Sequence, residues 1–470
     1  MPPFFFSAAV PVTLITTVVL LTSRTIQAQE PVTGLIPEVS KADLAMPGIM
    51  PDRIILTWHG DPARSQSVTW RTSTTVTRAV AELAVADGGP KFTRFVATFP
   101  ATTETLKTDL NEANFHSVRF EGLDPEKRYV YRVGDGKNWS EWFQFSTASS
   151  EPRPFSFIYF GDAQNDLRSM WSRVIREAQR EAPKASFMIH AGDLINRAES
   201  DSDWHEWFAA GSWINAMVPS IPAAGNHEMA KVDDLRRLSH HWRPQFTLPE
   251  NGVSGLEESC YTLVYQGVRI IVLNTNEKIQ EQAAWLETIL AANQERWVMC
   301  TFHFPIFSTG RNRDNESLRA AWKPILDKYK VDLVLQGHDH TYGRTGLETP
   351  VATANLKTGV NASEMTAGTV YVVSVSGPKM YDVQKYPFMK RAAEDTQLFQ
   401  IIHINQDKLH YEAYTVAGVL YDAFTLTKRA GMPNELTEQI PPTPERLRPP
   451  VVLEEKKASE ALQTDKTIAP

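Results

Sequence analysis

Two patterns of hydrophobic and polar positions divide the chain. Between residues 50 and 148, short runs that alternate or cluster β-branched and aromatic residues, such as 53–58 and 129–133, are separated by turn sequences. About seven such runs at this spacing predict an all-β sandwich. Over residues 154–427, apolar strand segments alternate with helical segments, which predicts an α/β domain with largely buried sheets. The sandwich segment shows no cluster of acids, bases or metal ligands, so we expect a structural or docking module.

The two ends of the chain differ in composition from the rest. Residues 1–21 carry no charged side chain and are rich in Phe, Val, Leu and Ile. This pattern is typical of a secretory signal peptide over residues 1–29, cleaved near Ala28 or Gln29, and predicts export to the periplasm or the extracellular space without stable membrane insertion. An uncleaved membrane anchor is the alternative, because the run approaches the ~20 residues that a span needs. Residues 430–470 are rich in Pro, Glu and Lys, which predicts a flexible tail.

Composition and charge exclude several classes of protein. The 470 residues are 42% hydrophobic and 22% charged, which is ordinary for a globular protein and excludes a collagen-like or wholly disordered chain. The formal net charge of −7, without a basic patch, argues against a nucleic acid polymer as partner. Cys260 and Cys300 are too few for a disulfide scaffold and lack the CxxC spacing of a metal site, so we expect buried free thiols.

Polar clusters directly follow strands of the predicted α/β domain. Taken singly, a Gly-Asp after a strand is usually a turn whose Asp caps the next helix. Together the clusters offer carboxylates, an amide and imidazoles at strand ends, which is a ligand set for divalent transition metals. The absence of a thiolate argues against a structural zinc site. The clusters are Gly161-Asp162-Ala163-Gln164, Gly192-Asp193-Leu194-Ile195-Asn196, Gly225-Asn226-His227-Glu228, Phe302-His303-Phe304-Pro305 and Gly337-His338-Asp339-His340.

In this order the clusters resemble the signature of the calcineurin-like metallophosphoesterases. The β-sandwich placed before them resembles the purple acid phosphatase branch of that superfamily. Within the sandwich, Leu123-Asp124-Pro125 followed by Tyr129 and Tyr131 is similar to the loop and tyrosine corner of fibronectin type III domains. The resemblance spans residues 50–427. It implies an α/β four-layer sandwich (αββα) preceded by the all-β sandwich, a two-metal site and hydrolysis of phosphate esters.

The resemblance also implies a role for individual residues. Asp193 bridges two divalent metal ions (Fe, Mn or Zn), and His227 lies near the leaving group as the catalytic general acid. Arginines and a tyrosine close to the clusters are candidates to bind the substrate phosphate, because a guanidinium clamps phosphate bidentately. The remaining ligands are Asp162 and His340 on one metal and Asn226, His303 and His338 on the other, and the substrate-binding candidates are Arg311, Arg313 and Tyr342.

The chain departs from the family pattern around the first metal. Asn196 stands where purple enzymes have a tyrosinate, and Gln164 stands where other branches have a histidine. The residues leave two alternatives open: Gln164 or Asn196 contributes an amide oxygen to the metal, or Asn196 hydrogen-bonds His227 and orients it. Because no phenolate is available, we expect a colourless protein.

The resemblance therefore implies a metal-dependent hydrolase of phosphomonoesters. A hydroxide generated by two metals attacks phosphorus, while His227 protonates the departing alkoxide. The expected partner is a small phosphate ester. A phosphodiesterase or nucleotide hydrolase is the alternative that uses the same site. A non-catalytic protein that binds phosphate or a surface is the alternative of a different class, motivated by the missing tyrosine and histidine ligands.

Overall fold

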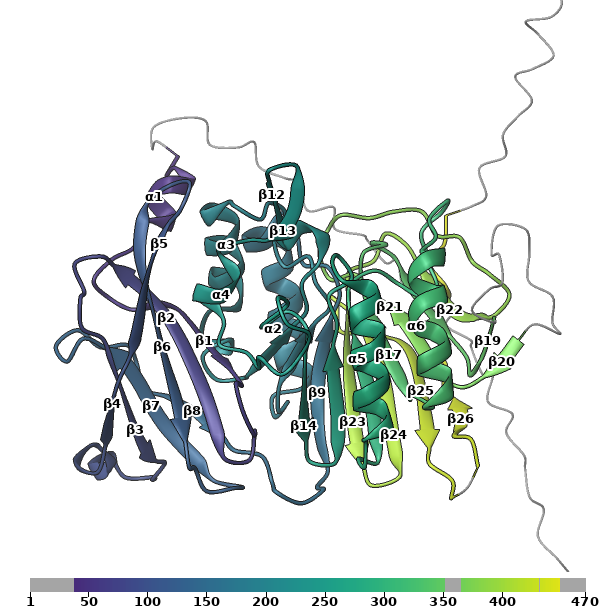
Figure 1. Cartoon of the computed structure of the whole chain (residues 1–470), viewed down its shortest axis with the longest axis horizontal. Coiled ribbons are helices and arrows are strands. Elements are labelled where there is room, and N and C mark those ends of the chain that lie inside the picture. The colour runs from purple at the N-terminus through teal and green to yellow at the C-terminus, as the bar shows by residue number, and fades with distance from the viewer. Residues whose placement is uncertain (1–37, 351–364, 431, 449–470) are drawn as a thin grey trace, which may run out of the picture. The chain divides into compact units, whose positions relative to one another are not determined.

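The computed structural model describes residues 38–350, 365–430 and 432–448. Residues 1–40 and 41–470 are separate units, and the second contains all the elements described below, beginning with the short helix α1 (Lys41–Ala45) (Figure 1). Within the described ranges, no helix has the length and apolar character that crossing a membrane requires. The expected signal peptide, residues 1–29, lies outside the described residues.

The first domain is a sandwich of two antiparallel four-stranded sheets, as predicted. The sheets have the orders β1-β2-β6-β5 and β4-β3-β7-β8. Their inward-facing side chains, among them Trp70, Phe120 and Tyr131, form one hydrophobic core. The elements are β1 (Asp52–Thr57), β2 (Ser65–Ser73), β3 (Val80–Val85), the 3-10 helix η1 (Pro90–Arg94), β4 (Ala97–Pro100), β5 (Thr102–Lys107), β6 (Glu112–Glu121), β7 (Arg128–Gly134) and β8 (Phe143–Ser146).

The second domain is built on two seven-stranded sheets. The first has the order β11-β10-β9-β23-β24-β25-β26. Its strands are β9 (Phe155–Phe160), β10 (Met188–His190), β11 (Ser220–Pro222), β23 (Leu398–Asn405), β24 (Lys408–Thr415), β25 (Leu420–Thr427) and β26 (Glu435–Glu438). The second has the order β14-β15-β16-β17-β21-β18-β22. Its strands are β14 (Tyr261–Tyr265), β15 (Val268–Val272), β16 (Trp297–Thr301), β17 (Leu333–Gln336), β18 (Tyr342–Thr345), β21 (Val370–Val373) and β22 (Met389–Ala393).

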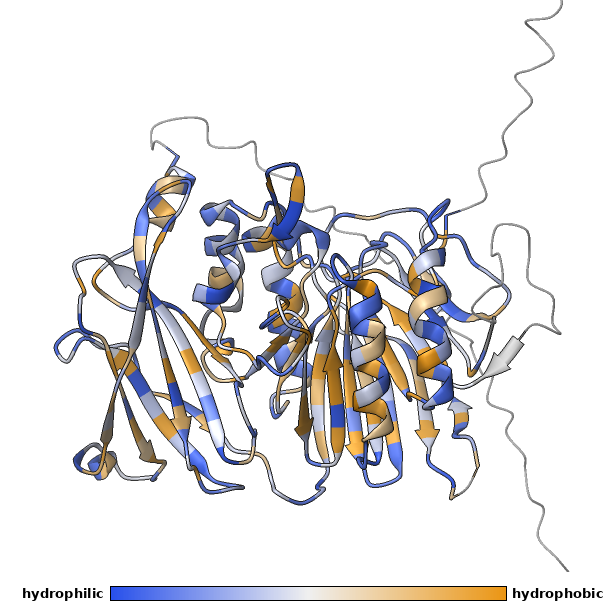
Figure 2. Ribbon diagram, viewed as in Figure 1, coloured by the Kyte–Doolittle hydropathy of each residue, from blue (hydrophilic) through white to orange (hydrophobic). Residues whose placement is uncertain are grey.

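Alternation of side chains along the strands places the second sheet between two cores. Ile270 and Met299 face the first sheet within the largest cluster of buried residues. Their neighbours Ile271 and Cys300 point to the opposite face and pack with Trp322 and other residues of the helices. Figure 2 shows hydrophobic residues gathered along the strands of both sheets.

Helices cover the outer faces of the two sheets. α2 (Ser172–Glu181), entered through the π-helical turn η2 (Leu167–Trp171), packs on β23 of the first sheet and contacts α3 (Asp201–Gly211). α5 (Ile279–Ala291) and α6 (Glu316–Lys328) lie side by side over the second sheet (Figure 1). The order helix, sheet, sheet, helix confirms the predicted αββα sandwich. Shorter elements are η3 (Ser212–Ile214), η4 (Asn226–Glu228), α4 (Trp242–Gln245) and the hairpins β12 (Met229–Val232) with β13 (Leu235–Leu238) and β19 (Glu348–Pro350) with β20 (Met365–Ala367).

The strands that precede the polar clusters run parallel to one another. β9, β10 and β11 are parallel neighbours in the first sheet, and β15, β16 and β17 are parallel neighbours in the second. Parallel strands present their carboxyl ends at one edge of a sheet. All the polar clusters therefore emerge at carboxyl-end edges of two sheets that pack face to face.

Two predictions about the remaining chain have different outcomes. Cys260 and Cys300 are buried free thiols, as expected. The prediction of a flexible tail from residue 430 is wrong for Glu435–Glu438, because this segment pairs with β25 as the edge strand β26. A short run of alternating residues is sufficient to extend an antiparallel sheet even in a polar context, and composition alone does not reveal it. Residues 449–470 lie outside the described part.

Buried polar contacts join the sandwich to the second domain. Arg53 Nη1 lies 2.8 Å from Asp201 Oδ1, and Arg71 Nη1 lies 3.3 Å from Asp201 Oδ2. The Tyr131 hydroxyl donates a hydrogen bond to the carbonyl oxygen of Ala216 at 2.7 Å. These contacts agree with a structural or docking role for the sandwich.

Candidate metal centre

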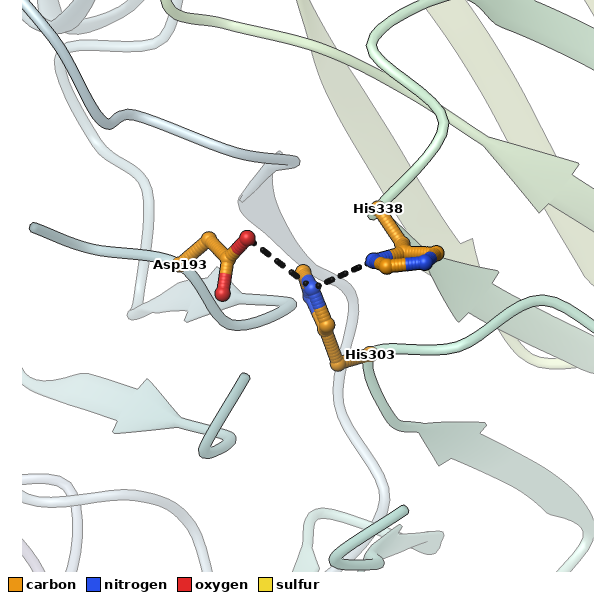
Figure 3. Close-up of side chains that lie close together, drawn as sticks. All are labelled: Asp193, His303 and His338. Carbon is orange, nitrogen blue, oxygen red and sulfur yellow. Dashed lines mark hydrogen bonds and ion pairs between the residues drawn. The ribbon is translucent and has the colours of Figure 1, made fainter. Parts of the chain in front are cut away.

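Two overlapping groups of donor atoms lie at the edge where the polar clusters meet. Asp193, His303 and His338 form one group, and Asp162, Asp193 and His340 form the other, with all donor atoms of a group within 4.8 Å of one another. In the first group, His303 Nε2 lies 3.1 Å from Asp193 Oδ2 and 3.2 Å from His338 Nδ1 (Figure 3). Asp193 belongs to both groups, so its carboxylate is shared by two adjacent candidate positions.

Asn226 joins the first group through its side-chain oxygen. Asn226 Oδ1 lies 3.2 Å from His303 Nε2. The structure thus divides the predicted ligands as the sequence reasoning did: Asp162 and His340 lie on one side of Asp193, and the other imidazoles with Asn226 lie on the other side. Their role as ligands stays a prediction, but the side chains converge as that role requires.

Left-handed backbone conformations direct several of these side chains into the site. Asp193 has φ 51°, His338 has φ 74° and His340 has φ 48°. The Gly-His-Asp-His segment is therefore not extended, because the chain turns sharply after β17. Non-glycine residues in this region cost about 1–3 kcal/mol each and cluster at functional sites.

Two glycines of the clusters are required by close approach. A Cβ at Gly225 would lie 2.2 Å from Asp193 Oδ1, and a Cβ at Gly337 would lie 2.4 Å from Asp162 Oδ2. Any side chain at these positions would displace a carboxylate of the site. This explains why glycine opens Gly-Asn-His-Glu and Gly-His-Asp-His.

Hydrogen bonds to main-chain carbonyls fix which imidazole nitrogen faces the site. His303 Nδ1 lies 2.9 Å from the carbonyl oxygen of Ala191, and His340 Nδ1 lies 3.0 Å from that of Lys379. Because a carbonyl oxygen only accepts, each Nδ1 carries a proton and each Nε2 is the nitrogen that faces the donor group. This is the arrangement that metal-binding histidines adopt.

Asp162 supplies the clearest indication that the site fits a cation. Its Oδ2 accepts a hydrogen bond from the backbone N–H of His338 at 2.7 Å. Its Oδ1 is buried, lies 3.6 Å from His340 Nε2 and has no hydrogen-bond partner within the described residues. A buried carboxylate oxygen without a donor is costly unless a cation satisfies it. The donor set of carboxylates, imidazoles and an amide suits a divalent metal.

The electrostatics around Asp193 favour positive charge at its neighbours Asp162 and His303. Burial and the nearby Asp193 carboxylate raise the pKa of Asp162 to about 7. Burial opposes protonation of His303, but the charge of Asp193 and a hydrogen bond to it raise the pKa of His303 to about 9. In both cases the negative charge of Asp193, in a place where water is excluded, favours the protonated form. A cation bound there would take the place of a proton on Asp162 or His303 and would relieve the repulsion between the two carboxylates.

His227 differs from the other histidines in being partly exposed, with 26% of its side chain accessible. Its Nδ1 lies 2.5 Å from the main-chain oxygen of Asn196, to which it donates, and its Nε2 lies 3.9 Å from Asp193 Oδ2. Asn196 thus hydrogen-bonds His227, as one of the two alternatives stated, but it does so through its main-chain oxygen rather than its side chain. A metal-ligand role for the Asn196 amide stays a prediction. His227 stands at the mouth of the site.

Family comparisons agree with both domains. Residues 51–147 match the purple acid phosphatase N-terminal domain, and residues 155–342 match the calcineurin-like phosphoesterase domain. Residues 155–342 therefore form a calcineurin-like phosphoesterase domain. This family assignment confirms the resemblance that the five clusters indicated.

Individual relatives of the chain are distant in sequence. An uncharacterized protein of Mycobacterium tuberculosis is 27% identical over 359 residues, which is 66% of each chain. Fe(3+)-Zn(2+) purple acid phosphatase 12 of Arabidopsis thaliana is 26% identical over 247 residues, or 49% of this chain and 52% of that one. The chain therefore spans from about half to just under two thirds of the length of these relatives. The structure of purple acid phosphatase PPD1 from yellow lupin seeds has the same fold, with a TM-score of 0.64 and 19% identity over 80% of this chain and 74% of that chain.

Glu228 is a residue of the candidate site that sequence reasoning missed. Its buried carboxylate accepts hydrogen bonds from the backbone N–H groups of Gly225 at 2.7 Å, Asp193 at 2.9 Å and Leu194 at 2.8 Å. It therefore ties the loop after β10 to the loop after β11, which carry Asp193 and Asn226. Its position as the last residue of Gly-Asn-His-Glu was the available signal, but only the fold shows what it holds.

We expect Glu228→Gln to lower the free energy of unfolding by about 3 kcal/mol, because an amide NH₂ would face main-chain N–H donors in a buried position. Urea unfolding monitored by tryptophan fluorescence measures the change. The matched control is Glu257→Gln, because Glu257 also accepts a backbone hydrogen bond, from Gly255 at 2.8 Å, but in an exposed position. The control should change stability by about 0.5 kcal/mol or less. Equal midpoints for the two variants would contradict this role of Glu228.

Gln164 does not present its oxygen to the donor groups. Its Nε2 donates a hydrogen bond to Asp193 Oδ2 at 2.7 Å, and its Oε1 accepts one from Lys379 Nζ at 3.1 Å. The prediction that Gln164 ligates a metal through its amide oxygen is therefore wrong for this arrangement. Lys379, which engages the amide oxygen, lies 215 positions away in the sequence.

The substrate-binding candidates divide into two kinds. Arg311 and Arg313 line a cavity of about 440 Å³ together with Tyr381, whose ring centroid lies 4.6 Å from that of His340. Arg313 is held by Asp339, with 2.7 Å between Nε and Oδ1. This cavity adjoins the donor groups, so both arginines remain candidates.

Tyr342 is wrong as a substrate-binding residue. It begins β18, is fully buried in the core between the sheets, and donates a hydrogen bond from its hydroxyl to Asp422 Oδ2 at 2.6 Å. A polar residue directly after a motif can begin a buried strand as readily as it can bind a ligand. Side chains alternate along β18, and Tyr342 lies on the face that points into the core.

Proposed function

We propose that this chain is a metal-dependent phosphoesterase that hydrolyses phosphomonoesters with the help of two divalent cations. The observation that carries the proposal is that two largely buried donor groups share one carboxylate, that of Asp193. When bound, two such cations stabilise charge on the phosphoryl oxygens and lower the pKa of water. Asp162 and His340 would hold one cation, and Asn226, His303 and His338 would hold the other.

His227 is the proton donor in this proposal. Its Nδ1–H is engaged by the Asn196 carbonyl, so Nε2 is the nitrogen that faces the donor groups. As an imidazolium it carries a proton on Nε2 that passes to the departing alkoxide, after which the ring is neutral. General-acid catalysis of this kind contributes about 10²–10⁴ in rate.

Two arginines support binding of an anionic substrate. Arg311 and Arg313 are partly exposed on the wall of the cavity beside His340. The Arg313 guanidinium lies 5.2 Å from the centroid of the Tyr381 ring and is tied to Asp339, so it is held in place before substrate arrives. A preorganised guanidinium binds a phosphate with less loss of side-chain freedom.

The experiment that tests the proposal compares p-nitrophenyl phosphate with bis(p-nitrophenyl) phosphate. The purified protein is stripped with EDTA and reloaded with Mn²⁺, Zn²⁺ or Fe²⁺ before the assay. We expect no turnover after stripping, recovery on reloading and faster hydrolysis of the monoester. Faster hydrolysis of the diester would favour a phosphodiesterase. Binding of two cations without turnover of either ester would favour the non-catalytic alternative.

We also propose that the chain is exported, on the uncharged apolar composition of residues 1–21. Amino-terminal sequencing of protein recovered outside the cytoplasm tests this, because the mature chain should begin close to Gln29. An intact Met1 in the exported protein would contradict cleavage and favour the membrane-anchor alternative.

A further inference from the structure

The amide of Gln164 is clamped between an anion and a cation. Gln164 is completely buried, with Nε2 2.7 Å from Asp193 Oδ2 and Oε1 3.1 Å from Lys379 Nζ. The reverse orientation would place the amide oxygen against the carboxylate oxygen and the NH₂ group against the ammonium. Neither contact makes a hydrogen bond. The two neighbours therefore determine the orientation of the amide.

This orientation makes the two donor groups unequal. The group of Asp193, His303 and His338 has the Asn226 oxygen beside it, 3.2 Å from His303 Nε2. The group of Asp162, Asp193 and His340 has no corresponding oxygen from Gln164, because that oxygen already accepts from Lys379. A site with fewer donor atoms holds a given divalent cation less tightly.

Lys379 also adds positive charge to the weaker side. Its main-chain oxygen accepts the hydrogen bond of His340 Nδ1 at 3.0 Å, so this residue is adjacent to that ligand. Its ammonium lies 5.5 Å from the centroid of the Tyr381 ring, which itself packs against His340. A fixed ammonium near a cation site opposes binding of the cation, and more strongly where water is scarce.

We propose that Lys379 is a positioning residue that makes the two cation sites unequal. Through Gln164 it withholds a ligand from the site of Asp162 and His340, and through its own charge it weakens that site further. The inference rests on the two-cation site of the proposed function. It predicts one tightly bound cation and one that exchanges readily with the solution.

The test is a calorimetric titration of the stripped full-length protein with Mn²⁺ in the absence of substrate. We expect two dissociation constants for the unaltered protein that differ at least tenfold. Lys379→Met should tighten the weaker one by about 10–100-fold, the range by which outer-shell partners alter metal affinity. Lys379→Arg keeps the charge and the donor, so it should leave both constants close to their original values.

The matched control is Lys385→Met, because Lys385 lies in the same segment but pairs with Glu445 at 2.6 Å away from the donor groups. It should leave both constants unchanged. Equal affinities in the unaltered protein, or a weaker site that Lys379→Met leaves unchanged or weakens, would overturn the inference.

The outcomes separate this inference from the proposed function. If the protein hydrolyses phosphate esters but binds two cations equally, the inference fails and the function stands. If it binds cations unequally and responds to Lys379→Met but hydrolyses no ester, the inference stands and the function fails.

Discussion

Asp193→Asn is expected to lower hydrolysis of p-nitrophenyl phosphate by about 10³-fold or more. Asp193 is the one ligand common to both donor groups. Its Oδ1 accepts the backbone N–H of His227 at 2.9 Å, and its Oδ2 lies 3.1 Å from His303 Nε2. An amide in its place replaces an anionic ligand oxygen with an NH₂ group that binds no cation, so both sites lose charge and one loses a donor. Steady-state kinetics with metal content determined on the same samples measures the effect.

Asp332→Asn is the matched control for this substitution. Asp332 is equally buried and accepts the backbone N–H of Val298 at 2.9 Å, but it lies outside the donor groups. The control should lose stability and keep its rate per folded molecule. Turnover by Asp193→Asn within tenfold of the unaltered protein, with two cations bound, would contradict the role of Asp193.

His227→Ala is expected to affect substrates according to their leaving groups. Alkyl phosphates release a strongly basic alkoxide that needs protonation, so their hydrolysis should fall by about 10²–10⁴-fold. Nitrophenolate leaves without a proton, so hydrolysis of p-nitrophenyl phosphate should fall by less than about tenfold. Measuring kcat/KM across a series of leaving groups should show a steeper dependence on leaving-group basicity in the variant.

Asn196→Ala provides the control for His227. The main-chain carbonyl that holds His227 Nδ1 is kept in this variant, so the imidazole stays oriented. We expect the leaving-group dependence of the unaltered protein. Equal losses on alkyl and aryl substrates for His227→Ala would remove His227 as the general acid.

The sequence was sufficient to predict that the candidate ligands lie close together, because each one follows a strand that the local pattern of residues reveals. Asp162, Asp193, His303 and His338 each come directly after a hydrophobic strand, and parallel strands bring their carboxyl ends to one edge. A residue that directly follows one of these strands therefore lies at the edge where the candidate site forms. The αββα layering followed for the same reason, from segments whose periodicity is clear.

The predictions that proved wrong share a different cause. The orientation of each side chain depends on a partner that is distant in the sequence. Lys379 orients Gln164 across 215 positions of the sequence, and Asp422 captures Tyr342 across 80. Glu228 gains its role only when two loops meet. The pattern of residues also did not predict the turn after β17. The left-handed conformations of His338 and His340 require tertiary contacts that outweigh their local cost.

Anomalous diffraction from crystals soaked in Mn²⁺ tests the two-cation centre most directly. We predict two peaks about 3.5–4 Å apart on either side of the Asp193 carboxylate. One should lie among Asn226, His303 and His338, and the other, at lower occupancy, should lie beside Asp162 and His340. A single peak, or peaks remote from Asp193, would contradict the account.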